Sequence, residues 1–263
     1  MNEMNSPLQN ASPPFERINP EGRAPVLLLC DHASAHVPAD LNDLGLDSTL
    51  LRRHIAVDIG AGDVTRRLAP LLDAPALLCG TSRLVIDCNR HLDDPSSVPE
   101  VSDGIVIPGN VNLTAPDRAA RESRFFAPYH AAVEASLAGF AARGIRPTLI
   151  SIHSFTPVMN GFERPWHVGL LWDPEPGPSL AVLRELRRDA GLIVGENEPY
   201  PGNDPRGYAL SVYGTKRDLP FICFEIRQDL IDTHHTAEDW AHRLAAALAP
   251  VLERSGTSPP AGD

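Results

Sequence analysis

Two histidines follow short apolar segments at separate places in the chain. His32 follows the segment PVLLLC after one intervening residue, Asp31, and His153 comes directly after the segment TLISI. Histidines held at the ends of two strands are a start for a catalytic zinc site, which uses three protein ligands and leaves a fourth position for water. The alternative is that each histidine only caps its strand or bonds to the backbone.

A carboxylate would complete such a ligand set, and the chain offers two candidates. Asp58 interrupts the segment HIAVDIGAGD, where an acid either faces a site or needs a buried partner. Asp31 is adjacent to His32 and could instead orient a histidine that binds the metal. His32 has no acid three residues later, because Ala35 occupies that position. We favour Asp58 as the third ligand, with Asp31 as the alternative.

The segment SRLVIDCNR, residues 82–90, places charged and amide side chains on either side of a strand-like apolar triplet. The planar fork of an arginine matches a carboxylate, and a neighbouring amide can complete the grip. We therefore expect Arg83, Asn89 and Arg90 to bind the carboxylate of an acidic substrate. A salt bridge between Arg83 and Asp87 is the structural alternative.

The apolar segment PFICFEIRQDL carries Glu225 and Arg227 two residues apart. Both side chains project to the same side of a strand. Glu225 is the candidate general base, and Arg227 could hold either the substrate or Glu225 itself. A mutual ion pair is the alternative. A Ser-His-Asp triad that uses Ser34 or Ser154 is less favoured, because neither serine lies in a nucleophile elbow.

Elements that could position these side chains are visible in the hydrophobic pattern. Strands are predicted at PVLLLC, PALLC, TLISI, HVGLLW and PFICFEI, and helices at 48–72, 114–144, 178–190 and 236–254. The alternation predicts an α/β fold with a mixed, mostly parallel central sheet and helices on both faces. Ligands of such sheets bind at the carboxyl ends of the strands. We expect one domain over 25–254, between loosely ordered tails at 1–24 and 255–263.

Composition disfavours two classes of partner, nucleic acids and membranes. The formal net charge is -11, which disfavours a nucleic-acid partner. The absence of a long apolar stretch and of a signal-peptide profile predicts a cytoplasmic protein without a membrane partner. The four cysteines have no CxxC spacing and are predicted to be small buried residues.

Five motifs, CDHAS, HIAVDIGA, SRLVIDCNR, SIHSF and FEIRQDL, occur in this order along the chain. Together they resemble the N-formylglutamate amidohydrolase family. The resemblance implies a zinc-dependent hydrolase with a fold similar to the zinc carboxypeptidases, which cleaves N-formyl-L-glutamate to formate and glutamate in histidine degradation. It also implies that His32 and His153 are metal ligands, that Asn89 and Arg90 hold the substrate carboxylate, and that Glu225 is the catalytic glutamate.

The chain departs from the family pattern at the first motif. DHAS stands where PHSG is more usual, and the carboxypeptidase H-x-x-E pair is missing. Another N-acyl amino acid is therefore an alternative substrate.

The resulting hypothesis is hydrolysis of a small-molecule acidic N-acyl amino acid by a water that Zn²⁺, or another divalent metal, activates. The expected metal ligands are His32, Asp58 and His153, the expected base is Glu225, and the expected substrate ligands are Arg83, Asn89, Arg90 and Arg227. Two rival functions are a metallocarboxypeptidase-like deacylase and a non-catalytic protein that binds an acidic ligand. The sequence does not set the oligomeric state.

Overall fold

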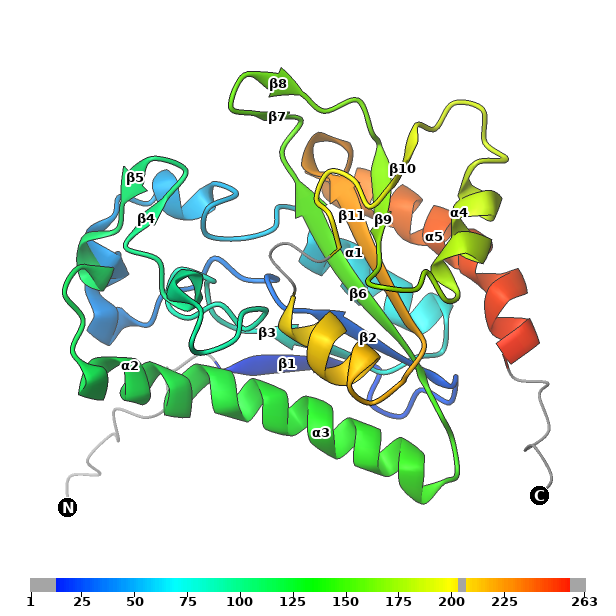
Figure 1. Cartoon of the computed structure of the whole chain (residues 1–263), viewed down its shortest axis with the longest axis horizontal. Coiled ribbons are helices and arrows are strands. Elements are labelled where there is room, and N and C mark those ends of the chain that lie inside the picture. The colour runs from blue at the N-terminus through cyan, green and yellow to red at the C-terminus, as the bar shows by residue number, and fades with distance from the viewer. Residues whose placement is uncertain (1–12, 203–206, 256–263) are drawn as a thin grey trace, which may run out of the picture.

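A central sheet of seven strands organises the chain (Figure 1). The computed structural model describes residues 13–202 and 207–255 of the 263. The strand order is β1-β3-β2-β6-β11-β9-β10. The strands are β1 (Phe15–Ile18), β2 (Val26–Cys30), β3 (Ala76–Cys79), β6 (Thr148–Phe155), β9 (Val168–Leu171), β10 (Val194–Glu196) and β11 (Phe221–Arg227). Two small hairpins lie apart from it, β4 (Val101–Ser102) with β5 (Ile105–Val106), and β7 (Val158–Met159) with β8 (Phe162–Glu163).

The centre of the sheet is parallel. Strands β3, β2, β6 and β11 are parallel neighbours, whereas β1 is antiparallel to β3 and β9 is antiparallel to β11. Strand β10 is parallel to β9. The predicted α/β fold with a mixed, mostly parallel sheet is thus confirmed.

Helices cover both faces of the sheet (Figure 1). The α-helices are α1 (Ala61–Leu71), α2 (Ala115–Arg121), α3 (Ala127–Ala142), α4 (Ser179–Leu186) and α5 (His234–Ser255). Two π-helical segments are η6 (Glu122–Phe126) and η7 (Ala209–Thr215). Short 3-10 segments are η2 (Ala39–Gly45), η3 (Leu50–Arg52), η4 (Pro95–Ser97), η5 (Pro108–Asn110) and η8 (Gln228–Leu230). None of these helices in the described part of the chain is both long and apolar enough to cross a membrane.

Strand β2 shows why helices are needed on both faces. Val26 and Leu28 belong to the apolar cluster that includes α1, α4 and α5. Leu27 and Leu29 point the other way, into the cluster that includes Tyr129 and its neighbours on α3. All four strand residues are fully buried, so each face of the strand requires a covering layer.

The five strands predicted from apolar segments are confirmed, but three other expectations need correction. The predicted helix at 48–72 is shorter, since α1 begins only after Gly60, which has a φ of 81°. A side chain there would clash with the carbonyl oxygen of Ile231, so the position needs glycine. As a result Asp58 lies in a loop and not on a helix.

The other two corrections concern the N-terminal tail and the SRLVIDCNR segment. Part of the predicted tail, Phe15–Ile18, is ordered as β1, because its backbone pairs with β3 at the edge of the sheet. Residues 1–12 and 256–263 of the predicted tails lie outside the described residues. The triplet at 84–86 is buried in a turn and not in a strand, because Val85 N–H donates to Ser82 O (2.9 Å).

Candidate active site

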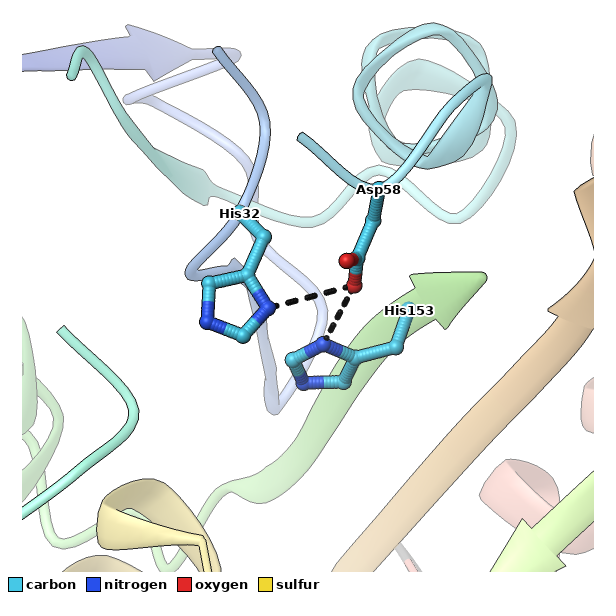
Figure 2. A group of neighbouring side chains, drawn as sticks. All are labelled: His32, Asp58 and His153. Carbon is cyan, nitrogen blue, oxygen red and sulfur yellow. Dashed lines mark hydrogen bonds and ion pairs between the residues drawn. The ribbon is translucent and has the colours of Figure 1, made fainter. Parts of the chain in front are cut away.

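Three buried side chains from different elements converge near the centre of the sheet (Figure 2). His32 lies just beyond β2, Asp58 lies in the loop before α1, and His153 lies on β6. Asp58 Oδ2 is 3.2 Å from His32 Nδ1 and 2.9 Å from His153 Nδ1. One donor atom from each of the three lies within 4.8 Å of the others, and within the described ranges no other group of three such side chains could hold a metal ion.

Backbone contacts fix the Asp58 loop against the two histidine segments. Asp58 N–H donates to His32 O (3.0 Å), and Ala61 N–H donates to Asp58 O (3.1 Å) as α1 begins. The Ser154 hydroxyl donates to Ile59 O (2.8 Å). The carboxylate is therefore held between β2 and β6 by hydrogen bonds on both sides.

The outer nitrogens of both imidazoles have their own partners. His32 Nε2 is 2.7 Å from Asp87 Oδ1, and His153 Nε2 is 2.8 Å from Ser151 Oγ. Partners of this kind orient the histidines of metal sites and leave the other ring nitrogen to face the ion. The two Nδ1 atoms with Asp58 thus fit a divalent metal ion.

Asp31, the alternative third ligand, is directed elsewhere. Its Oδ1 accepts a hydrogen bond from the Tyr129 hydroxyl (2.6 Å). Its Oδ2 is 3.7 Å from His153 Nε2, which is the ring nitrogen that faces away from Asp58. The geometry therefore favours Asp58 over Asp31 as a ligand.

The charges of the side chains in this cluster influence one another. Burial and the nearby Arg83 lower the pKa of His32, but the carboxylates of Asp87 and Asp58 raise it more, to about 9. Burial raises the pKa of Asp58, yet His32 and His153 together hold it well below its usual value. Without a metal, a proton on His32 therefore neutralises part of the carboxylate charge.

A metal ion must displace that proton, so its affinity is expected to depend on pH. The His32 proton is bound below its raised pKa of about 9 and lost above it. The apparent affinity for Zn²⁺ should therefore rise at least about tenfold per pH unit from pH 6.5 to 8.5, because binding releases a proton in this range. Competition with a chromophoric chelator at several pH values measures this slope. Asp87→Asn is the informative variant, because it removes a carboxylate that raises the pKa of His32. The pH above which the affinity for Zn²⁺ becomes constant should therefore be lower in this variant. An affinity for Zn²⁺ that does not change with pH would contradict His32 as a metal ligand.

A cavity of about 520 Å³ opens on this cluster. It is in the range that proteins use for small-molecule ligands. Glu225, Arg83, Asn89 and Arg90 line it together with the three candidate metal ligands. The structure thus brings seven of the eight predicted site residues to one place.

The two arginines that line the cavity, Arg83 and Arg90, have different partners. Arg83 donates to Asp87 Oδ2 from Nε (3.1 Å) and Nη2 (2.8 Å), and its Nη1 is 3.3 Å from Asp58 Oδ1. The salt bridge foreseen as the alternative for Arg83 is therefore present. Arg90 Nη1 donates to Asn89 O (2.9 Å), and among the described residues it forms no salt bridge.

Glu225 is positioned by the pairing of β6 with β11, which sets it beside His153 in the register. The side chain is buried, and among the described residues its Oε2 has no hydrogen-bond partner. Burial raises the pKa of Glu225, and the attraction of His153 offsets this only in part, so that the value is about 7. A carboxylate with this pKa can both accept and donate a proton near neutral pH.

Arg227 is not brought to the cavity. It is the last residue of β11, and its Nε donates to Asp229 Oδ1 (2.8 Å). It does not appear among the described residues that line the cavity. The strand ends at Arg227, and its guanidinium binds Asp229 instead of reaching the cavity.

Two orienting residues were missed in the sequence. The sequence pattern pairs Asp87 only with Arg83, although Asp87 also bonds His32. Ser151 is not among the predicted site residues, yet its position two residues before His153 in a strand places both side chains on one face. That spacing is a signal the sequence contains.

The chain matches a family model described as N-formylglutamate amidohydrolase over residues 24–232. It belongs to the N-formylglutamate amidohydrolase family. The family predicted from the five motifs is confirmed, and the chain is accordingly a hydrolase of carbon–nitrogen bonds other than peptide bonds.

Two solved structures resemble the chain over nearly its whole length. The gene product Atu2144 from Agrobacterium tumefaciens is 34% identical, with 92% of this chain and 96% of that chain covered and a TM-score of 0.88. The N-formylglutamate amidohydrolase from Ralstonia eutropha JMP134 is 22% identical, with 94% and 100% covered and a TM-score of 0.69. The second likeness supports the family's fold alone. No curated protein matches the chain.

Proposed function

We propose that the protein is a metal-dependent amidohydrolase that cleaves the amide bond of an N-formyl or N-acyl amino acid. The observation that carries this proposal is the convergence of two imidazole Nδ1 atoms and one Asp58 oxygen beside a buried, unpartnered Glu225 in a single cavity. The family makes N-formyl-L-glutamate, an N-formyl acidic amino acid, the reference substrate.

The metal would be held by His32, Asp58 and His153. Two nitrogen ligands and one oxygen ligand suit Zn²⁺, which accepts both donor types and keeps a position open in catalytic sites. When bound, a divalent ion polarises the scissile carbonyl and makes water a better nucleophile.

Glu225 supplies the acid–base chemistry. As a carboxylate it accepts a proton from the attacking water. As a carboxylic acid it then donates that proton to the nitrogen of the leaving amine, which breaks the carbon–nitrogen bond. Its raised pKa of about 7 suits both roles, since neither protonation state is strongly disfavoured near neutral pH.

Asn89 and Arg90 would hold the α-carboxylate of the substrate. Arg90 carries a charge without a described carboxylate partner, and Asn89 lines the same cavity as the candidate metal ligands. Arg83 already pairs with Asp58 and Asp87, so its part in this proposal is to hold those carboxylates in place.

Removal and return of the metal test the proposal directly. Chelator-treated protein is expected to retain less than about 1% of the activity on N-formyl amino acids, because a bound ion contributes several kcal/mol to the transition state. Added Zn²⁺ should restore it. The assay measures formate or acyl release from a panel of N-formyl, N-acetyl and peptidyl amino acids.

Two other outcomes would redirect the assignment. Turnover of peptidyl substrates alone would indicate a carboxypeptidase-like enzyme. Stoichiometric binding of an acidic amino acid without metal or turnover would indicate a binding protein.

A further inference from the structure

One wall of the cavity is apolar. Phe221, Cys223 and Glu225 alternate along β11, so all three side chains lie on the same face, and all three line the cavity. On the neighbouring strand β9, Leu171 pairs with Cys223 and also lines the cavity. Going along β11 away from the candidate base, the cavity surface therefore changes from ionisable to apolar.

The π-helical segment η7 extends this surface toward the candidate carboxylate-binding pair. Ala209 and Leu210 line the cavity, and Ala209 N–H donates to Asn89 Oδ1 (3.1 Å). The hydrogen bond ties the start of η7 to the loop that carries Arg90. We refer to the following five residues, which all pack in one apolar cluster, as the apolar wall: Leu171, Ala209, Leu210, Phe221 and Cys223.

The cations of the cavity are few. Within the described part of the chain, the lining contains two arginines and no lysine. Of these two described arginines, Arg83 forms salt bridges with Asp58 and Asp87, which leaves Arg90 for a substrate carboxylate. N-Formyl-L-glutamate carries two carboxylates, and a carboxylate buried without a partner is strongly disfavoured.

We propose that the apolar wall binds the side chain of the leaving amino acid, so that the preferred substrates are N-formyl or N-acyl derivatives of apolar amino acids. The inference rests on the proposed function. A substrate with its α-carboxylate at Asn89 and Arg90 and its scissile carbonyl near Glu225 and His153 has its α-carbon between these points. The apolar wall lies beside this α-carbon position. At one end it continues along β11 to Glu225, and at the other the Ala209 N–H of η7 donates to Asn89.

A comparison of substrates tests the proposal. N-formyl-L-phenylalanine or N-formyl-L-leucine is expected to have a kcat/KM at least about 100-fold above that of N-formyl-L-glutamate, because apolar contacts replace an unpaired charge in the transition state. In parallel, L-phenylalanine is expected to bind more tightly than L-glutamate in calorimetry with the metal-loaded protein.

A charge introduced into the apolar wall should reverse this preference. Leu171→Lys is expected to lower kcat/KM for N-formyl-L-phenylalanine at least about tenfold and to raise it for N-formyl-L-glutamate. Leu71→Lys is the matched control, because Leu71 is 43% exposed at the end of α1 and does not line the cavity. This control should leave unchanged the ratio of kcat/KM for N-formyl-L-phenylalanine to kcat/KM for N-formyl-L-glutamate. If Leu171→Lys does not fold, Cys223→Leu provides the test. The larger side chain should reduce the space in the cavity beside the apolar wall, and should lower activity on phenylalanine derivatives more than on glycine derivatives.

The outcomes separate this inference from the proposed function. Faster hydrolysis of N-formyl-L-glutamate than of the apolar derivatives would overturn the inference and leave the proposed function standing. If no N-acyl amino acid is hydrolysed, the proposed function fails, and the binding measurement decides the inference. Tighter binding of L-glutamate than of L-phenylalanine would then overturn it.

Discussion

Glu225→Gln is expected to lower kcat by about 10²–10⁴ and to leave the metal content of the protein unchanged. Glutamine keeps the size of the side chain but cannot accept the proton of the attacking water. Glu225 is not among the three candidate metal ligands. The measurement pairs steady-state kinetics with metal analysis of the same preparation.

Stability distinguishes a catalytic loss from a damaged fold. The pKa of Glu225 is raised from 4.5 to about 7 mainly by burial, so its charged form disfavours the folded state. That penalty begins as the pH rises above the unfolded value and is complete above about pH 7. Metal-free Glu225→Gln should therefore melt at a higher temperature than the wild type at pH 8. Glu163→Gln, on the exposed hairpin strand β8, is the control and should change neither rate nor stability. Full activity of Glu225→Gln would refute its role as the base.

His153→Ala is expected to abolish metal binding and to reduce activity at least about a thousandfold, since a loss of about 4 kcal/mol of metal contribution corresponds to that factor. Metal analysis after dialysis and kinetics with added Zn²⁺ measure both effects. His130→Ala is the matched control. His130 is buried as well, but its nitrogens bond the Tyr213 hydroxyl (2.8 Å) and Cys88 O (2.9 Å), and it is not among the candidate metal ligands. The control should lose stability and keep its metal.

A pair of aspartate variants identifies the third ligand. Asp58→Asn should lose the metal, because Oδ2 of Asp58 is the oxygen that both Nδ1 atoms face. Asp31→Asn should keep it, because Asp31 bonds Tyr129 instead. The reverse result would assign the ligand to Asp31.

Much of the fold could be predicted because its signals are local. Five apolar segments are long enough to form strands buried on both faces, and the structure has strands at all five. Strand β1 could not be foreseen, because its four residues, FERI, have no distinctive pattern and are held by pairing with β3. The start of α1 was missed because it depends on a contact between Gly60 and Ile231, which are far apart in the chain.

The sequence indicates which residues could form the site more readily than it indicates where they meet in the fold. Histidines and acids at strand ends stand out in an apolar sequence, whereas their meeting point depends on the order of strands in the sheet. Only the parallel pairing of β6 with β11 sets Glu225 beside His153. Arg227 illustrates the limit, since it shares the spacing of Glu225 but bonds Asp229 at the end of the strand.

The four central side chains of the site are held in two different ways. His153 and Glu225 stand on adjacent strands in the middle of the sheet, whereas His32 and Asp58 are carried by loops. Segments of the first kind open only when much of the domain unfolds, and loops accept sequence change more readily. Exchange of His32 or Asp58 for another ligand during evolution would therefore need only loop substitutions. A new general base, by contrast, would require the centre of the sheet to be rebuilt.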